Sequence, residues 1–340
     1  MTTASPAGKR PAVMTDVARL AGVSHQTVSR VLHDSSQVRP ETRERVLRAI
    51  EELDYRPNAM ARGLVSRRST MIGVITFDTI LFGPASTLLG IERAARAKGY
   101  GVSIATLEKL DRSSVVEAAN TLANQGVSGI VIIAPQTAVS SALHSMPRNL
   151  TAVAVECGPD SGLPAVSVDQ VGGAAQATAH LLELGHKTVW HVSGPGDWLE
   201  ARDRIEGWRS ILERHGAVEP PVITGDWSAR SGYAAGAMLA AQPDVTAVFA
   251  ANDQMALGML RAFYEKGLRV PDDVSVVGFD DIPEAPFLSP PLTTIRQDFD
   301  EMGRTAIATL LAILDGDSDP RPEPIASTLV VRESTGAPKR

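Results

Sequence analysis

The sequence predicts a fold in two parts, a small all-α headpiece over residues 13–56 and a larger α/β part over residues 71–332. Two observations lead to this prediction. Two short helical patterns joined by a glycine lie near the start of the chain, and short apolar runs alternate with helical patterns through most of the remainder. Such alternation is typical of parallel sheets covered by helices on both faces. A chain of 340 residues is long enough for two or three domains and a large core.

The headpiece begins with two short helices and a tight turn. Val17, Leu20 and Ala21 recur at helical spacing, so they predict one buried face in the first helix. Gly22 follows this helix, where glycine adopts the left-handed backbone of a helix end at the lowest cost. Ser24 can then cap the second helix through its hydroxyl group.

The second helix has an apolar back and a polar front. Three apolar residues are predicted to be buried: Val28, Val31 and Leu32. Gln26 and Arg30 lie four residues apart and share the opposite face, and His25 lies at the helix start. A helix with these side chains in front can contact base edges in the major groove of DNA. An ordinary helical hairpin with a solvated front is the alternative that this short pattern leaves open.

A third helix is expected from Pro40 to Leu53, because proline is favoured in a first helical turn. Val46 and Ile50 would lie on its buried side and close a three-helix core. Thr42, near the start of this helix, is placed to contact a phosphate group.

Three further segments are expected outside the two folded parts. Residues 1–12 predict a disordered tail, residues 57–70 a hinge helix with a linker, and residues 333–340 a second tail. The hinge sequence is compatible with a helix but too short to be a stable helix alone.

The charge of the chain is divided unevenly. The whole chain carries −6, which by itself argues against nucleic acid as a partner. Residues 1–70, however, hold 12 Lys and Arg against 7 Asp and Glu, a balance of +5, and the remainder carries −11. A small basic part on an acidic body suggests that only the basic part contacts phosphates.

Composition also indicates a compartment. The single cysteine, Cys157, excludes an internal disulfide and fits a reducing cytoplasm. No apolar run reaches the roughly 20 residues that a membrane span needs, and the N-terminus has no secretory signal. We therefore expect a cytoplasmic protein without a membrane partner.

In the α/β part, apolar runs predict strands, and helices are expected near residues 86–98 and 113–125. The strand runs are MIGVITF, GVSIAT, GIVII, TAVAV, AVSVD, TVWHVSG, TAVFAAND and DVSVVGFDD. Ligands of such sheets bind beyond the carboxyl ends of the strands. Polar and aromatic residues lie at or near these ends: Glu156, Arg204, Trp227, Asn252, Asp253, Asp280 and Asp281.

This set contains the groups that bind sugars, since carboxylates, amides and guanidinium groups bridge hydroxyls and an aromatic plane covers the ring. Each residue alone could instead be an exposed loop residue or a helix cap, so the argument depends on their convergence. No glycine-rich phosphate loop with suitable spacing occurs. His186 and His191 flank a strand, which is a weak metal pattern. We expect no enzyme activity, no catalytic residue, no metal and no cofactor.

The string DVARLAGVSHQTVSRVL, followed by YRPNAMARGL, resembles the DNA-binding headpiece of the LacI/GalR family of transcriptional regulators nearly residue for residue. The resemblance continues through GDWSARSGY, ANDQMALG, GLRVPDDVSVVGFDD and PPLTTIRQDF. It implies a helix-turn-helix headpiece and a two-lobed, type I periplasmic-binding-protein-like core with parallel sheets. The chain would cross between the lobes three times, near residues 168, 298 and 328.

The resemblance also implies site residues. DNA contacts would come from the headpiece and the hinge: Ser24, His25, Gln26, Thr27, Ser29, Arg30, Thr42, Asn58 and Leu64. In the family, the leucine at the place of Leu64 wedges into the central base step of the operator. A small effector would be held by Pro84, Glu156, Arg204, Trp227, Asn252, Asp280, Gln297 and Phe299.

Five positions depart from one member of the family that this chain resembles over most of its length. Phe82 replaces a polar residue, Glu200 a serine, Glu156 an aspartate, and Ile133–Ala134 an Asn-Tyr pair. The core of the sugar site is kept and its rim differs, so a different glycoside or oligosaccharide is expected. The leucine-rich tail through which that member forms tetramers has no equivalent, so a homodimer on pseudo-palindromic operator DNA is expected.

The function that follows is a DNA-binding repressor, which a small sugar or glycoside releases from its operator. A co-repressor-dependent regulator of the same family is one alternative. A transport-type sugar-binding protein is another, but it would leave the headpiece without a role.

Overall fold

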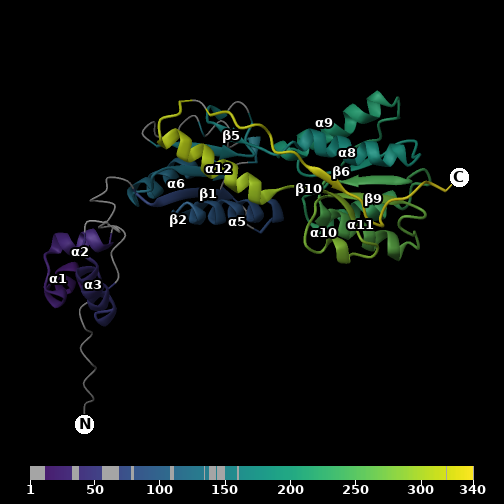
Figure 1. Cartoon of the computed structure of the whole chain (residues 1–340). Coiled ribbons are helices and arrows are strands. Elements are labelled where there is room, and N and C mark those ends of the chain that lie inside the picture. Colours follow the sequence, from purple (N-terminus) through teal and green to yellow (C-terminus); the bar gives the residue numbers. More distant parts are fainter. Residues whose placement is uncertain are drawn as a thin grey trace, which may run out of the picture. The chain divides into compact units, whose positions relative to one another are not determined.

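The computed structural model describes residues 12–32, 38–55, 69–77, 80–107, 111–133, 135–137, 143, 150–158, 161–318 and 320–339. The chain forms two compact units, Met1–Ser69 and Thr70–Arg340, and the second is called the body below (Figure 1). None of the helices in the described part of the chain is long and apolar enough to cross a membrane.

The headpiece contains α1 (Met14–Ala21), α2 (His25–Leu32) and α3 (Pro40–Glu52), as the sequence predicted. Gly22 ends α1 with a left-handed φ of 63°, and the Thr27 amide donates to Ser24 Oγ at 3.1 Å, which caps α2. The apolar core is formed by Val17, Ala18, Ala21, Val28, Val31, Val46, Ala49 and Tyr55. The expected burial of Leu20 is wrong: 47% of it is exposed, because Ala18 faces the core instead.

The first lobe of the body has a five-stranded parallel sheet in the order β2-β1-β3-β4-β5. Its strands are β1 (Met71–Phe77), β2 (Gly101–Leu107), β3 (Ile130–Ile133), β4 (Ala152–Val155) and β5 (Ala165–Val166). The helices are α5 (Phe82–Ala97), α6 (Arg112–Asn124) and α12 (Phe299–Leu314). Side chains along β3 alternate between the two faces, so Val131 packs with α5 and α12 whereas Ile130 packs with α6.

The second lobe has a six-stranded sheet in the order β11-β10-β9-β8-β6-β7, parallel except for the antiparallel edge strand β11. Its strands are β6 (Trp190–Ser193), β7 (Ile223–Thr224), β8 (Ala247–Ala250), β9 (Ser275–Asp280), β10 (Thr293–Arg296) and β11 (Thr328–Val330). Helices α8 (Gln170–Glu183) and α9 (Leu199–Arg214) cover one face. Helices α10 (Ala229–Leu239) and α11 (Asp253–Glu265) cover the other, and a short 3₁₀ helix, η2 (Ala285–Phe287), follows β9.

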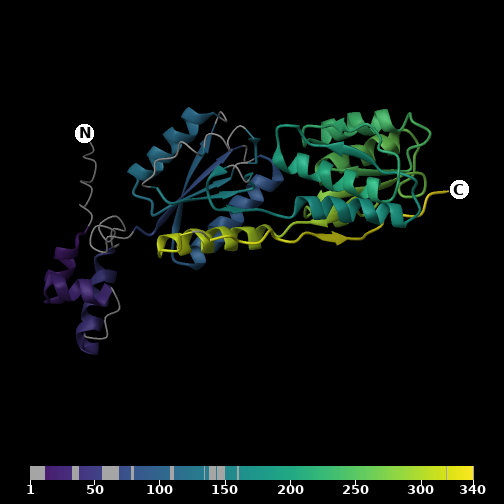
Figure 2. The same ribbon diagram turned by 90° about the horizontal axis from the view of Figure 1, so that it is seen from above.

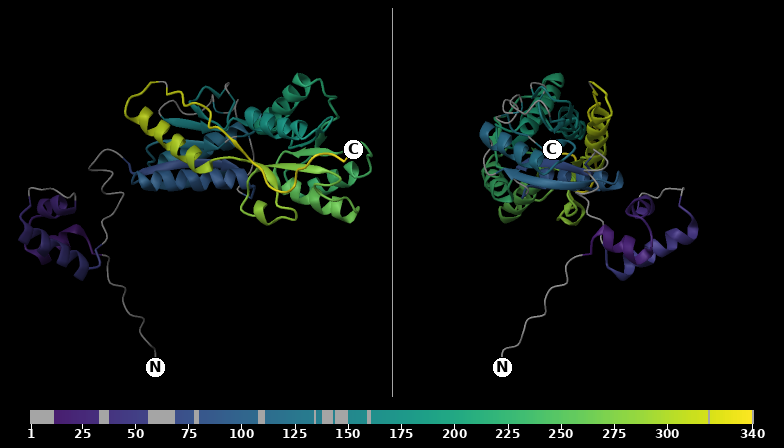
Figure 3. Two further views of the ribbon diagram at one scale, coloured as in Figure 1. Left: turned by 45° about the vertical axis from the view of Figure 1, so that its right-hand side comes forward. Right: turned by 90° about the vertical axis from the view of Figure 1, so that its left-hand side faces the viewer.

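The chain crosses between the lobes three times, close to the expected places. The first crossing follows β5, the second lies between β10 and α12, and the third precedes β11. The first and third lie side by side, because the Asp169 amide donates to the Ile325 carbonyl at 2.8 Å. Although α12 comes late in the sequence, it packs beside α5 in the first lobe (Figure 2). Figure 3 shows these connections between the two lobes from the side.

Residues 333–339, expected to be a tail, are attached to the second lobe. Ser334 is fully buried, donates to the Val276 carbonyl at 2.6 Å and accepts from the Thr293 amide at 2.8 Å. His186 contacts the Gly336 carbonyl through Nε2 at 3.0 Å. The segment therefore continues the packed body.

The predicted strands and helices are present, although their ends differ from the prediction. Helix α5 begins at Phe82, four residues before the expected start at residue 86, and includes Pro84 in its first turn, where proline is tolerated. Three strands were not among the predicted runs: β7, whose two residues form no apolar run, and β10 and β11.

Candidate functional site

A cavity of about 230 Å³ lies between the two lobes. Its lining includes all eight residues that the sequence pointed to for a small ligand: Pro84, Glu156, Arg204, Trp227, Asn252, Asp280, Gln297 and Phe299. The first lobe supplies the start of α5, the ends of β3 and β4, and the start of α12. The second lobe supplies α9, the loop before α10, the start of α11 and the end of β9.

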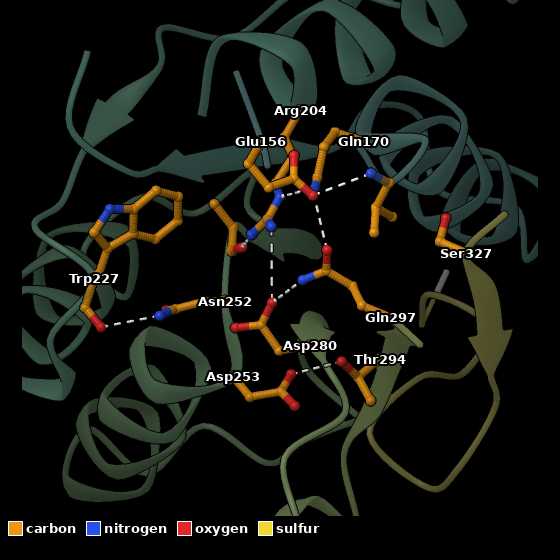
Figure 4. Close-up of polar contacts among 12 residues, drawn as sticks. Glu156, Gln170, Arg204, Trp227, Asn252, Asp253, Asp280, Thr294, Gln297 and Ser327 are labelled. Atoms are coloured by element: carbon orange, nitrogen blue, oxygen red, sulfur yellow. Dashed lines mark hydrogen bonds and ion pairs between the residues drawn. The ribbon is translucent and has the colours of Figure 1, made fainter. Parts of the chain in front are cut away.

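Four side chains form a closed ring of polar contacts on one wall of the cavity (Figure 4). Arg204 Nε donates to Gln170 Oε1 at 2.9 Å, and Gln170 Nε2 donates to Gln297 Oε1 at 2.9 Å. Gln297 Nε2 then donates to Asp280 Oδ1 at 2.6 Å, and Arg204 lies 3.7 Å from the same oxygen. Since each member fixes its neighbour, the ring holds polar groups in place without a ligand.

Arg204 is further held by backbone and aromatic contacts. Only 3% of it is exposed, and a terminal nitrogen donates to the Ala251 carbonyl. Its guanidinium carbon lies 3.8 Å from the ring centre of Phe279 and 5.5 Å from that of Trp227. A buried guanidinium with an ion pair and aromatic neighbours is a rigid donor for ligand oxygens.

Three carboxyl groups line the cavity, and each has a raised pKa. Burial is the largest cause, and it raises the pKa of Asp280 to about 6 and that of Glu200 to about 7. Burial also raises the pKa of Glu156 well above its ordinary value, with a further contribution from the negative charge of Glu200. Arg204 opposes the rise at all three groups.

The backbone is strained where it enters the cavity. Glu156, Trp227 and Asp280 have φ angles of 54°, 70° and 107°, although none is glycine. Such conformations are costly for residues with a Cβ, and they concentrate at functional sites. Two of these residues stand at the ends of buried parallel strands, which is where ligands of such sheets bind.

Asn252 has two roles that the sequence could not separate. Its Oδ1 accepts from the Met255 amide at 2.9 Å and so caps α11, which is the alternative role considered from the sequence. Its Nδ2 also donates to the Trp227 carbonyl at 3.0 Å, which fixes the backbone of that strained residue. The Trp227 ring packs on the backbone of Gly194, where a Cβ would overlap it.

The lobes are connected beside the cavity by a clasp of two short segments, residues 135–137 of the first lobe and 197–199 of the second. The Leu199 amide donates to the Pro135 carbonyl at 2.8 Å, and the Thr137 amide to the Asp197 carbonyl at 3.0 Å. This clasp places Trp198 in the cavity wall, where its ring meets Trp227 edge-on at 5.5 Å between centres.

Two carboxylates considered from the sequence lie away from the cavity. Asp253 is fully buried and accepts from Thr294 Oγ1 at 2.6 Å. Asp281 pairs with Arg296 at 2.6 Å and with Arg332 at 2.7 Å. Both are bonded within the second lobe, so they are structural groups and not ligand contacts.

The two histidines of the weak metal pattern are also structural. His191 is buried, stacks on Phe249 with 4.6 Å between ring centres and contacts that residue's carbonyl through Nδ1 at 2.9 Å. Burial lowers the pKa of His191 to about 3, so the ring is neutral. In the described part of the chain, no three His, Cys, Asp or Glu side chains converge to hold a metal ion.

Several residues of the site were missed as contributors by sequence reasoning, among them Gln170, Trp198, Phe82 and Glu200. Gln170 completes the polar ring, and Trp198 lines the cavity, but an amide at a helix start and an aromatic in a loop carry no distinctive pattern. Phe82 and Glu200 were noted only as departures from the family, yet both line the cavity. The Phe82 ring meets Phe299 edge-on, with 5.7 Å between ring centres. Of the departing pair, Ile133 lines the cavity and Ala134 lies outside the described residues.

The headpiece presents the second candidate site. On α2, His25, Gln26 and Arg30 are exposed, and Gln26 and Arg30 lie on the face opposite the buried Val28 and Val31. The remaining predicted contacts on the described headpiece are Ser24, Thr27, Ser29 and Thr42. Ser24 and Thr27 bond each other at 2.9 Å between their oxygens, so both also stabilise the helix start. Asn58 and Leu64, predicted in the hinge, lie outside the described residues.

Comparison with known proteins gives separate matches for the headpiece and for the body. Residues 13–58 match the family described as bacterial regulatory proteins, lacI family, and residues 178–335 match a periplasmic binding protein-like domain. The lactose operon repressor of Escherichia coli (strain K12) is 36% identical over 333 residues, which cover 97% of this chain and 92% of the repressor. The chain belongs to the lacI family.

Solved structures of lacI-family proteins match this fold closely. The lac repressor dimer bound to operator and the anti-inducer ONPF has a TM-score of 0.88 at 35% identity, covering 96% of this chain and all of that one. A complex of the transcriptional regulator CelR with cellobiose has a TM-score of 0.69 at 33% identity, covering 95% and 99%. These relatives are transcriptional regulators and not enzymes, in agreement with the expectation for this lacI-family chain.

Proposed function

We propose that this chain is a transcriptional repressor that a small sugar or glycoside releases from its operator. The observation that carries the proposal is the cavity, in which both lobes place carboxylate, amide, guanidinium and aromatic groups around one space. These are the groups that bridge sugar hydroxyls and cover a sugar ring. The solved complexes of relatives with ONPF and with cellobiose support a ligand of this class.

Within the site, Arg204, Asn252 and Asp280 bind hydroxyl groups, while Trp227 packs against the ring face. The remaining effector contacts are Pro84, Glu156, Gln297 and Phe299. Because the polar ring is already formed, a sugar epimer that cannot satisfy these buried groups leaves one of them unpaired, which is costly. The site therefore discriminates between epimers.

The headpiece, residues 13–56, binds operator DNA through the front of α2. The amide of Gln26 matches an adenine edge, and the guanidinium of Arg30 matches a guanine edge. In the hinge, residues 57–70, Leu64 wedges into the central base step, which bends the DNA. Two chains form a homodimer on a pseudo-palindromic operator, as the relative does in its operator complex, and the repressor acts in the cytoplasm.

Coupling between the two sites passes through the lobes. Sugar contacts both lobes, so it favours the arrangement in which they close on it. The hinge segments of the dimer form paired helices only when the lobes hold them together, and sugar binding separates them. Coupling free energies of this kind are typically about 1–3 kcal/mol.

The test is an operator-binding titration by fluorescence anisotropy, with operator DNA selected from a random pool. The sugars of a panel are added one at a time, and at least one of them should reduce the affinity of the chain for operator DNA at least about fivefold. If every active sugar instead tightens operator binding, the chain is a co-repressor-dependent regulator. If DNA binding is absent while sugar binds, a transport-type sugar-binding role replaces the proposal.

A further inference from the structure

The charges in the cavity are unbalanced. Among the described residues that line it, Arg204 is the one cation, and it faces the carboxyl groups of Glu156, Glu200 and Asp280. Arg204 forms its ion pair with Asp280, and the ring through Gln297 fixes that pairing. The positive charge is therefore already matched within the protein, and two carboxyl groups remain without a cationic partner.

Glu156 is only partly satisfied. It is 8% exposed, its Oε1 accepts from the Val168 amide at 3.0 Å, and the side chain of Gln170 also forms a hydrogen bond with the carboxyl group. A carboxylate can accept about four hydrogen bonds, so part of its capacity remains for a ligand in the cavity that Glu156 lines. The negative charge of Glu200 adds to the burial that raises the pKa of Glu156, which indicates that the two carboxyl groups act on each other.

Glu200 has no protein partner at all among the described residues. It lies in the first turn of α9, lines the cavity and makes no hydrogen bond or ion pair there. The positive charge of Arg204 stabilises the ionised form of Glu200, whereas the negative charges of Asp280 and Asp203 destabilise it. Without a partner, this half-buried carboxyl group retains its proton to a higher pH than usual, and a ligand cation beside it would stabilise its ionised form.

The surroundings of Glu200 suit an organic cation. Trp198, two residues earlier in the chain, lines the same cavity, and the ring of Trp227 meets it edge-on. An ammonium group is attracted to the face of an indole ring as well as to carboxylates. Phe82 and Phe299 provide an apolar surface elsewhere in the cavity for the uncharged part of a ligand.

We propose that the effector is an amino sugar, whose ammonium group is bound by Glu156 and Glu200 beside Trp198. This inference rests on the proposed function, since it specifies the chemical class of the sugar in the same cavity. The amine supplies the counter-charge that Arg204 does not, while Arg204, Asn252 and Asp280 bind the hydroxyl groups. Glu200 is then the residue that selects an amine over a hydroxyl at one ring position.

The experiment compares matched sugars by isothermal titration calorimetry on the full chain at about pH 7. The pairs are D-glucose and D-glucosamine, D-galactose and D-galactosamine, D-mannose and D-mannosamine, and cellobiose and the deacetylated β-1,4-linked glucosamine dimer. In at least one pair the amine should bind at least about tenfold tighter than its hydroxyl counterpart, because charge-assisted hydrogen bonds are the stronger ones. The N-acetylated form of that amine, which has no charge, should lose this advantage.

Two variants separate the role of Glu200 from general effects. Glu200→Gln keeps the size of the side chain but not its charge, so the preference for the amine should fall to about threefold or less. Glu213→Gln, on the exposed face of the same helix, should keep the full preference.

The outcomes distinguish the two proposals. If a hydroxyl sugar releases the operator and no amine in any pair binds more tightly than its hydroxyl counterpart, the proposed function stands and the amino-sugar inference is wrong. The inference is also wrong if Glu200→Gln keeps the full preference. If no sugar of either kind binds, the proposed function itself fails.

Discussion

Replacing Glu200 with Gln should stabilise the ligand-free body at pH 8 and reduce the pH dependence of its stability. Burial, together with Asp280 and Asp203, raises the pKa of Glu200 from 4.5 to about 7, against the opposing effect of Arg204. Over this window the native state keeps a proton that the unfolded chain has released. Native stability therefore falls as the pH rises toward 7 and is constant above it.

The structure sets the size of this effect. A pKa raised from 4.5 to about 7 lowers the free energy of unfolding by at most about 3 kcal/mol, since each unit of pKa shift is worth about 1.4 kcal/mol. For a unit of this size, that free energy corresponds to roughly 6–12 °C in Tm. Glutamine carries no titrating group, so the advantage of the variant should be absent near pH 4.5 and complete above pH 7.

Thermal unfolding followed by tryptophan fluorescence measures this difference. All four tryptophans lie in the body, so the signal reports on the body alone. Glu213→Gln is the matched control and should follow the wild type at every pH. If Glu200→Gln and the wild type lose stability in parallel between pH 5 and 8, the surroundings of Glu200 do not raise its pKa, and the reasoning fails.

Four further substitutions test the remaining sites. Gln26→Ala and Arg30→Ala should each weaken operator binding by about 1–3 kcal/mol and relax the preference at one base position. An equal loss of affinity for random DNA would mean that these side chains contact only the phosphate backbone of the DNA. Arg204→Ala should keep operator binding but abolish release by sugar, because it breaks the polar ring; a normal response to sugar in an anisotropy titration would remove Arg204 from the site. Gly194→Ala should displace the Trp227 ring and weaken sugar binding at least about tenfold, with operator binding retained; calorimetry that shows unchanged affinity would exclude stacking on Trp227.

The sequence predicted the strands of the sheets better than the ends of the helices. Apolar runs such as Ile130–Ile133 and Ala247–Ala250 are buried on both faces, and such runs have few alternatives. Helix starts depend on single hydrogen bonds, which a pattern does not show. In α1, for example, the Asp16 carboxylate accepts from the Val13 amide at 3.0 Å and fixes the start, although valine is a poor capping residue.

For the site, residues that follow strands could be predicted because parallel strands end at one edge of a sheet. Glu156 and Asp280 were found in this way. The same rule also selected Asp253 and Asp281, which bond to Thr294 and to two arginines within the second lobe. Whether a carboxylate faces a cavity or a neighbour depends on side-chain direction and three-dimensional packing, and a sequence contains no direct signal for either.

Reciprocal coupling between the two ligands tests the central claim most directly. The affinity of the full chain for its sugar is measured by calorimetry with and without saturating operator DNA, and the affinity for operator is measured with and without saturating sugar. Linkage requires the two factors to be equal, and we expect each ligand to weaken the other by about 5- to 150-fold. Affinities that do not depend on the other ligand would contradict a repressor released by sugar, and mutual strengthening would identify a co-repressor in its place.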